Sequence, residues 1–395
     1  MDLRFSAEDE AFRAEFRAWL DAHLPAEWRD PAFWAAKTPD EAFELRRRWE
    51  ADKARAGWAG IHWPVEFGGR GGTPAQKAIY DEEMARAGAP LTVNSLGLTF
   101  LAPTVMAIGT PEQKREIIGP LLRNEVIWCQ GFSEPGAGSD LAAVRTKAVP
   151  DGDEFVVSGQ KIWTSNALHA DRMFALVRTG TGERKHHGLT MLLIDLRVPG
   201  VDVRPLRQLS GANDFGEVFF DEVRVPRSQV LGAEGRGWDV AMLLLSFERG
   251  SSAIGQYTMY RRELDEIVDL ARRTERDGRP VAEHPVVRQA IAQAVVELET
   301  LRLHSLHVLT EVERGKPLGA SSSVTKLHWS ATHQRIGELF TDVAGAGHQL
   351  TGDAATPVAR ALQRAWLWSR SETIWGGSSE IQRNIVAEHL LGLPR

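Results

Sequence analysis

The sequence predicts an α+β fold with several domains: an N-terminal α-helical domain, a middle antiparallel β-domain and a C-terminal four-helix-bundle domain. Apolar residues recur at helical spacing from the N-terminus to about residue 122. From Glu125 short apolar runs alternate with turn residues, and after Ala233 the helical period returns and holds to the C-terminus. We therefore expect domains at residues 1–124, 125–233 and 234–395, a number that suits a chain of 395 residues.

The helices of the first domain are predicted from capping residues and apolar spacing. Ser6 with Asp9 opens the first helix, which Pro25 ends, and Thr110 with Pro111 opens the last. A glycine-rich loop, residues 58–72, interrupts the series without the spacing of a dinucleotide cradle. The expected helices cover residues 6–24, 41–56, 73–87, 92–108 and 110–122.

The middle domain is predicted from one strong hairpin signal and a series of apolar runs. The turn Pro150-Asp151-Gly152-Asp153 separates two expected strands, residues 142–149 and 154–158. Further strands are expected over residues 172–178, 188–196, 201–206 and 216–225. The C-terminal helices are expected over residues 238–271 as one helix or a broken pair, then over 287–309, 321–344, 357–374 and 378–391.

Composition excludes several classes of function. Forty-seven basic against fifty-three acidic residues give a net charge of −6, so neither nucleic acid nor an anionic membrane surface is expected as a partner. No apolar run approaches the ~20 residues of a membrane span, and with no signal-peptide pattern the chain is expected in the cytoplasm. The single cysteine, Cys129, excludes an intrachain disulfide, and the pair His186-His187 lacks the spacing of a metal site, so no metal is expected.

Two segments of the middle domain are the strongest functional signal. Residues 130–140 read Q-G-F-S-E-P-G-A-G-S-D, a loop whose glycines and hydroxyls free polar groups to face a ligand. Residues 161–166 read K-I-W-T-S-N, in which the Trp163 indole offers a plate for a flat ring and Ser165 offers a hydroxyl beside it.

These two segments resemble those of the acyl-CoA dehydrogenase family, a group of flavoenzymes, and the resemblance extends over nearly the whole chain. It implies that FAD is the cofactor and that Ser139 also lies beside the thioester substrate. It further implies FAD contacts in both the middle and the C-terminal domain, at Gln130, Phe132, Ser133, Gly138, Ser139, Trp163, Thr164, Ser165, Ser378 and Glu380.

The family reaction removes a proton from the α-carbon of an acyl-CoA thioester while a hydride passes from the β-carbon to flavin N5, giving a 2-enoyl-CoA. One base position of the family is occupied here by Gly376, which cannot abstract a proton. The alternative position, just before an arginine on the first helix of the bundle, is occupied by Glu248. The resemblance therefore implies Glu248 as the base, its pKa raised by apolar neighbours. The Gly376 N–H would donate to the thioester oxygen.

The acyl pocket is implied by the same resemblance, but the acyl group is not. The expected substrate contacts are Leu96, Ser139, Leu245, Ser246, Arg249 and Gly377. Two adjacent glycines leave space, and fatty, branched-chain, aromatic and steroid side-chain thioesters all remain open. The implied place of the chain is fatty acid or lipid metabolism.

The chain departs from the family where a neighbouring subunit usually helps to hold FAD. Residues 272–281 lack the Phe-Gly of an Arg-x-x-Phe-Gly motif, and residues 342–346 lack the Gln and the second Gly of a Gln-x-x-Gly-Gly motif. We therefore expect either a homo-oligomer, dimer or tetramer, or a heterotetramer in which a sister chain completes the flavin site. The expected electron acceptor is an electron-transferring flavoprotein. Two alternatives are a flavin-dependent monooxygenase or oxidase of the same fold, and a subunit that only completes a partner's FAD site.

Overall fold

The computed structural model describes residues 5–247, 253–316 and 319–394. The chain forms two compact units. The bundle unit comprises Met1–Ala42, Gly72–Pro90 and Arg249–Arg395, and the sheet unit comprises Phe43–Gly71 and Leu91–Glu248.

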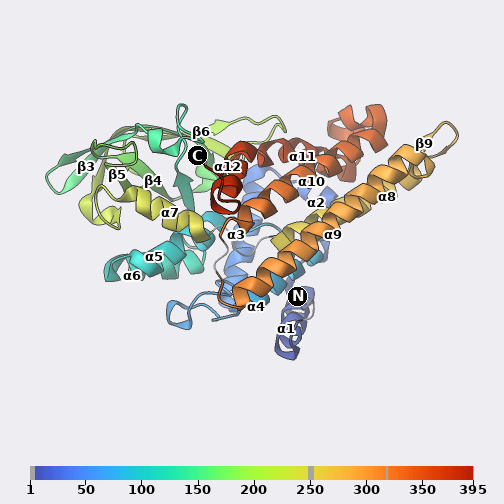
Figure 1. Ribbon diagram of the computed structural model, residues 1–395, viewed down its shortest axis with the longest axis horizontal. Coiled ribbons are helices and arrows are strands. Elements are labelled where there is room, and N and C mark those ends of the chain that lie inside the picture. The colour runs from blue at the N-terminus through green and yellow to red at the C-terminus, as the bar shows by residue number, and fades with distance from the viewer. Residues whose placement is uncertain (1–4, 248–252, 317–318, 395) are drawn as a thin grey trace. The chain divides into compact units, whose positions relative to one another are not determined.

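The bundle unit is helical. Its helices are α1 (Ala7–His23), α2 (Pro31–Ala35), α4 (Pro74–Ala87), α8 (Ala253–Arg273), α9 (Pro285–Glu313), α10 (Ser321–Ala344), α11 (Pro357–Glu372) and α12 (Ser379–His389). Helix α3 (Pro39–Arg55) begins in this unit and continues into the other. The four long helices α8 to α11 pack on one another, and Figure 1 shows α8, α9 and α10 side by side. The expectation of a C-terminal four-helix bundle is confirmed.

The core of the bundle unit follows from helical spacing. Buried residues on α8 such as Leu264 and Ile267, and on α9 such as Leu298 and Leu301, meet Ile336 and neighbouring residues of α10 in one apolar cluster. Helix α4 packs on α8 and α9, and α1 packs on α4, so two N-terminal helices belong to the same unit as the C-terminal bundle.

A two-residue turn closes a small hairpin at the end of α8 (Figure 1). Strands β9 (Glu275–Arg276) and β10 (Arg279–Pro280) pair antiparallel, and both turn residues have positive φ, Asp277 at 54° and Gly278 at 73°. This is the geometry of a tight hairpin turn, in which glycine at the second position is favoured.

The sheet unit combines one eight-stranded sheet with helices α5 (Ala102–Ile108), α6 (Pro111–Leu122) and α7 (Gly237–Phe247). The strands are β1 (Trp128–Gly131), β2 (Lys147–Asp151), β3 (Glu154–Ser165), β4 (Arg172–Arg178), β5 (Leu189–Asp195), β6 (Val201–Leu206), β7 (Phe215–Pro226) and β8 (Val230–Leu231). Their order is β6-β7-β3-β2-β4-β5-β8, and β1 pairs with β4. Most pairs are antiparallel, as expected, but β1 and β2 lie parallel to β4.

The side chains of β4 are buried on both faces of the sheet. Met173, Ala175 and Val177 point into one apolar cluster, which also contains Cys129, whereas Phe174 and Leu176 point into a second cluster with α5, α6 and α7. Because successive side chains of a strand alternate between faces, the unbroken apolar run Met173–Val177 supplies both clusters.

Several elements differ from the sequence-based expectation, among them β3, which continues past the expected residues 154–158 to Ser165. Residues 142–146 are not part of a strand, since β2 begins only at Lys147 and Leu141–Ala143 forms a short 3₁₀ turn. The backbone N–H groups of Arg145 and Thr146 bond to the carboxylate of Glu134 instead of to a neighbouring strand. The helix expected over residues 92–108 begins later, at Ser95, and contains a π-helical turn at Gly97–Leu101 that leads into α5.

Across the described ranges, no helix is both long enough and apolar enough to cross a membrane. Within these ranges no group of three or more His, Cys, Asp or Glu side chains is arranged to hold a metal ion.

Candidate functional site

The two segments singled out in the sequence lie together in the sheet unit. Ser133 lies two residues after the end of β1. Its carbonyl accepts the N–H of Ile162 on β3 at 3.0 Å. This bond brings the loop that begins at Ser133 beside the end of β3, where Trp163, Thr164 and Ser165 follow. The two segments are therefore neighbours in the sheet unit.

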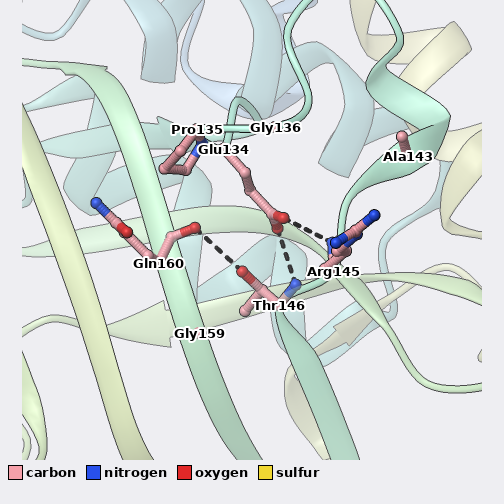
Figure 2. Close-up of a pocket in the computed structure, with 8 residues that line it drawn as sticks. All are labelled: Glu134, Pro135, Gly136, Ala143, Arg145, Thr146, Gly159 and Gln160. Atoms are coloured by element: carbon pink, nitrogen blue, oxygen red, sulfur yellow. Dashed lines mark hydrogen bonds between the residues drawn. The ribbon is translucent and has the colours of Figure 1, made fainter.

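The carboxylate of Glu134 organises the loop from inside. One carboxylate oxygen accepts the N–H of Arg145 at 2.6 Å, and the other accepts the N–H of Thr146 at 2.9 Å, as Figure 2 shows. The backbones of Glu134 and Ala137 also exchange two hydrogen bonds, each of 3.0 Å. The loop is therefore closed on itself and tied to the segment before β2. A pocket of about 290 Å³ lies here, lined by Glu134, Pro135, Gly136, Ala143, Arg145, Thr146, Gly159 and Gln160 (Figure 2).

Lys161 completes this arrangement from β3. Its side chain is 0% exposed, and its ammonium donates to the Glu134 carboxylate at 2.8 Å. Its other donors reach the carbonyls of Phe132, at 3.1 Å, and Leu176, at 2.6 Å. The three donors of a lysine ammonium are thus matched by three acceptors, which offsets the cost of burying the charge.

The pKa values of this pair are consistent with an ion pair. Burial lowers the pKa of Lys161 to about 8, although the Glu134 charge works in the opposite direction. Burial also works against ionisation of Glu134, but the charge and the hydrogen bond of Lys161 outweigh it, so the pKa of Glu134 lies below its usual value. At pH 7 the ammonium and the carboxylate therefore both carry charge.

Trp163 presents its indole to solvent from a strained position. Its φ is 58°, in the left-handed region that bulky residues rarely adopt, and its side chain is 56% exposed. The ring meets Phe215 edge to face, at a centroid distance of 5.9 Å and an interplanar angle of 83°. Strained residues of this kind cluster at ligand sites. An exposed aromatic plate beside the partly buried Ser165 fits the flat ring system of FAD.

The remaining FAD contacts expected in the sheet unit have different surroundings. Phe132 is buried and packs edge-on against Phe174, and its carbonyl accepts from the Lys161 ammonium. Gln130 is partly buried on β1, and Gly138 and Ser139 are exposed in the loop. Thr164 is 1% exposed, and its hydroxyl has no hydrogen-bond partner among the described residues.

The expected acyl-side residues Leu96, Leu245 and Ser246 lie on or beside two elements that pack on each other, the π-helical turn Gly97–Leu101 and α7. Leu96 and Leu245 are partly buried and pack against the same apolar cluster. Ser246 is exposed near the end of α7, and its hydroxyl donates to the Leu243 carbonyl at 2.6 Å. The π-helical turn begins at Gly97, directly after Leu96, and such turns occur frequently at functional sites.

The expected C-terminal residues lie in a loop of the bundle unit between α11 and α12. Gly376 and Gly377 have positive φ values, 64° and 84°. The Gly376 carbonyl accepts from the Gln382 amide at 2.7 Å, and the Gly377 carbonyl accepts from the Lys326 ammonium at 2.8 Å. Of the residues that the structure describes, none accepts a hydrogen bond from the Gly376 N–H. That N–H is available to a ligand.

Ser378 and Glu380 open helix α12. The Ser378 hydroxyl accepts the N–H of Ile381 and so caps the helix. Glu380 is exposed in the first turn, where hydrogen bonds from its own backbone N–H and from Ser378 lower its pKa. The expected residues Glu248 and Arg249 lie outside the described residues.

Several residues that organise the site were not predicted from the sequence. Glu134 and Lys161 lie inside the two motifs, but nothing in the motifs assigned them to each other. The sequence carried no local signal for this pair, because Lys161 follows Ser158, Gly159 and Gln160 and lies beyond the expected strand 154–158. Asn94 is fully buried, and its side-chain amide bonds to the Val126 carbonyl at 2.9 Å and to the Trp128 N–H at 3.0 Å. It fixes the segment before Leu96 to β1.

The chain matches family models along almost its whole length. The models are "Acyl-CoA dehydrogenase, N-terminal domain" over residues 6–125, "middle domain" over 129–223 and "C-terminal domain" over 235–391. Among individual proteins, the acyl-CoA dehydrogenase IpdE1 of Mycobacterium tuberculosis is 43% identical over 98% of each chain. The IpdE1 of Mycolicibacterium smegmatis is 42% identical, also over 98% of each chain.

The chain is also similar, over its whole length, to chains in solved structures. The ChsE4-ChsE5 complex from Mycobacterium tuberculosis has a chain that is 30% identical and superposes with a TM-score of 0.86, with 100% of each chain covered. The Tcur3481-Tcur3483 steroid ACAD has a chain that is 31% identical, with a TM-score of 0.85 and 100% of each chain covered.

Proposed function

Since the chain belongs to the acyl-CoA dehydrogenase family, an FAD-dependent family of enzymes, we propose that it converts an acyl-CoA thioester to the 2-enoyl-CoA with Glu248 as its base. The observation that carries the proposal is the surface of the sheet unit where the Glu134–Lys161 ion pair holds the loop after β1 beside Trp163. This surface suits a flat ring, and the exposed Ser139 lies in the same loop.

Each residue has a defined task in this proposal. Glu248 takes the proton from the α-carbon and becomes a carboxylic acid. Negative charge then develops on the thioester oxygen, where the Gly376 N–H donates a hydrogen bond. A hydride leaves the β-carbon, so a carbon–carbon double bond forms between the two carbons. Bound FAD supplies the acceptor for that hydride. Trp163 and Ser165 hold the flat ring, and exclusion of water strengthens the hydrogen bond at the thioester oxygen.

The same proposal assigns the expected contacts. For FAD they are Gln130, Phe132, Ser133, Gly138, Ser139, Trp163, Thr164, Ser165, Ser378 and Glu380. For the acyl-CoA they are Leu96, Ser139, Leu245, Ser246, Arg249 and Gly377.

We propose a bulky, steroid-derived acyl group as the substrate class. One similar structure is described as a steroid ACAD. The two glycines Gly376 and Gly377, which carry no side chain, agree with a wide acyl group.

We further propose that a sister chain completes the flavin site, and that an electron-transferring flavoprotein takes up the electrons. Two similar structures are complexes of two different chains by their names. In this chain the residues after α8 form the β9–β10 hairpin. The hairpin is hydrogen-bonded to other residues of the bundle unit. Arg276 donates to the Asp342 carbonyl at 2.5 Å, and its own carbonyl lies 2.9 Å from the imidazole of His284.

The test of the catalytic proposal is an anaerobic spectrum of the FAD-loaded protein with a panel of acyl-CoA thioesters, including steroid side-chain thioesters. We expect the flavin absorbance to bleach, and Glu248→Gln to retain FAD but bleach at least 1,000-fold more slowly. Glu116→Gln, at an exposed position of α6, serves as the matched control and should bleach at the wild-type rate. Equal bleaching rates in wild type and Glu248→Gln would refute Glu248 as the base. Rapid reoxidation of the reduced flavin by air would favour an oxidase or monooxygenase.

A further inference from the structure

Four polar side chains form a cluster inside the bundle unit, three of them buried and the fourth, Glu263, partly exposed. Tyr260 and Glu263 come from α8, His333 from α10 and Glu372 from the last position of α11. One imidazole nitrogen of His333 lies 2.7 Å from the Glu372 carboxylate, and the other lies 2.9 Å from the Glu263 carboxylate. Tyr260 stacks on the imidazole at a centroid distance of 4.0 Å and donates to Glu372 at 3.4 Å.

This cluster is costly to keep in an apolar core. His333 is 2% exposed and Glu372 is 3% exposed. Burying charged groups costs several kcal/mol per ion, and apolar residues of similar volume often stabilise a core at least as well. Hydrogen bonds are directional, so such a cluster can fix the position of a neighbouring segment in a way that apolar packing cannot.

The neighbouring segment is the loop that carries Gly376. Glu372 ends α11 only four positions before Gly376. On α10, Lys326, Trp329 and His333 follow one another at intervals of three and four residues, so they share one face of the helix.

All three residues of that face contact the segment from 372 to 377. Lys326 donates to the Gly377 carbonyl at 2.8 Å. The Trp329 ring lies 5.5 Å from the Trp375 ring, measured between centroids. His333 holds Glu372. One face of α10 thus fixes the loop at its start, its middle and its end.

The loop needs such external ties because it contains two adjacent glycines. Glycine loses more conformational freedom on ordering than any other residue. Gly376 and Gly377 both have positive φ, and a methyl group at Gly377 would come within 2.6 Å of the Gln382 amide. The backbone at Gly377 therefore has no room for a side chain next to Gln382. The contacts from α10 hold the loop in place.

We propose that His333 is a positioning residue: by bridging Glu263 and Glu372 it fixes the end of α11 and so aims the Gly376 N–H at the thioester oxygen. The inference rests on the proposed function, in which that N–H stabilises the charge on the oxygen. A misplacement of about 1 Å at such a donor can cost on the order of 100-fold in rate.

The protonation state of His333 agrees with a bridge. Burial by itself would lower the pKa of His333, but the hydrogen bonds and charges of Glu263 and Glu372 outweigh burial and raise the pKa to about 9. At neutral pH the ring therefore carries two N–H groups and can donate to both carboxylates at once. Burial raises the pKa of Tyr260 well above its usual value, so its hydroxyl stays a donor.

The test uses the FAD-loaded protein, purified in whichever form holds flavin, alone or with its sister chain. His333→Phe keeps a ring against Tyr260 and removes both hydrogen bonds. We expect kcat to fall 10- to 100-fold while KM changes by less than threefold and the flavin content stays unchanged. His328→Phe is the matched control, because His328 lies on the same helix but bonds to the Glu297 carbonyl instead of the loop. It should keep wild-type kcat.

A second readout reports the thioester oxygen directly. A 3-thia-acyl-CoA cannot transfer a hydride from its β-position, so its α-deprotonated form accumulates beside oxidised flavin and absorbs at long wavelength. We expect His333→Phe to weaken this absorbance at least threefold at pH 7, and Glu372→Gln, which retains an acceptor oxygen, to restore most of it relative to Glu372→Leu. An unchanged kcat and an unchanged absorbance in folded His333→Phe would overturn the inference.

Three further outcomes are distinguishable. If His333→Phe does not fold, Glu263→Gln weakens one bond of the bridge at a partly exposed position, and wild-type values of both readouts in that variant would overturn the inference. If Glu248→Gln bleaches as fast as wild type, the proposed function fails first. If Glu248→Gln is inactive but the His333 and Glu263 variants match wild type, only the positioning role fails.

Discussion

Lys161 carries a positive charge into the core of the sheet unit, where its side chain is 0% exposed. Its ammonium joins the loop after β1, through Glu134 and the Phe132 carbonyl, to β4, through the Leu176 carbonyl. Removal of one partner of a buried ion pair leaves the other charge without compensation, which is far more costly than loss of a surface pair. The residue therefore couples the stability of the unit to the shape of the FAD surface.

We expect Lys161→Met to lower the free energy of unfolding by about 3–5 kcal/mol, because the Glu134 carboxylate stays buried without its counter-charge. The FAD content should fall in the same variant, since the loop loses one of its two ties to β3. Denaturant midpoints and the ratio of flavin to protein measure both effects. Lys147→Met, at an exposed position of β2, is the control and should match wild type. Full flavin content in Lys161→Met would contradict the expected coupling.

A second prediction at the scale of single residues concerns Trp163. If its exposed indole is the plate for the flavin ring, Trp163→Leu should weaken FAD binding about 3- to 10-fold, the size of an aromatic stacking contribution of about 0.5–1.5 kcal/mol. Trp163→Phe should retain most of the affinity. Titration of apoprotein with FAD, followed by quenching of flavin fluorescence, gives both constants. Equal affinities for Leu and Phe would show that the indole does not stack.

At the scale of elements, the cluster between α8, α10 and α11 makes stability depend on pH. The folded chain holds the His333 proton to about pH 9, whereas an unfolded chain releases it near pH 6.5. The stabilisation from this proton is therefore complete below pH 6.5 and is lost as the pH rises through about 9.

We expect the free energy of unfolding to fall between pH 6.5 and pH 8 by on the order of 2 kcal/mol from His333 alone. The range stops at pH 8 because Lys161, whose pKa lies at about 8, acts in the opposite direction at higher pH. Urea unfolding at both pH values measures the change. The double variant His333→Phe/Glu372→Gln should lose most of this dependence, and an undiminished dependence in it would assign the effect to other groups.

Some elements were predictable from sequence alone because the apolar period and a local stop signal fixed their extent. Helix α10 covers Ser321–Ala344, as expected, since Gly345 ends the apolar period. The expected strand over residues 142–149 was wrong at its start, because the Glu134 carboxylate, far away in sequence, takes the N–H groups that a strand would have paired. Side-chain competition for backbone groups leaves no mark in the local period.

At the scale of the whole molecule, the packing of α1 and α4 with the bundle helices could not have been predicted from sequence. Arg262 on α8 donates to the Ala85 carbonyl at the end of α4, over a separation of 177 residues. Amphipathic spacing shows that a helix has an apolar face but not which partner covers it. Similarly, the motifs at residues 130–140 and 161–166 predicted the place of the candidate site, but the cluster around His333 has no motif.

The sister-chain proposal is also tested with whole proteins. Expressed alone, this chain should hold well under one FAD per chain, because the β9–β10 hairpin stands where the family motif would continue into Phe-Gly. Co-expression with a homologous chain from the same genome that retains that motif should raise the flavin content, and size-exclusion chromatography with light scattering should show an assembly of both chains. Stoichiometric FAD in the chain purified alone would refute the proposal.

The position of Cys129 has a practical consequence. It is the one cysteine of the chain, it is 0% exposed in the apolar cluster beside β4, and burial raises the pKa of its thiol far above the usual range. A thiolate is needed for alkylation. The native protein therefore behaves as a cysteine-free background: a single cysteine introduced at an exposed position can carry a spin label or a dye with no second labelling site. Distances between the two units can then be measured in solution, with and without acyl-CoA, without first deleting a native thiol.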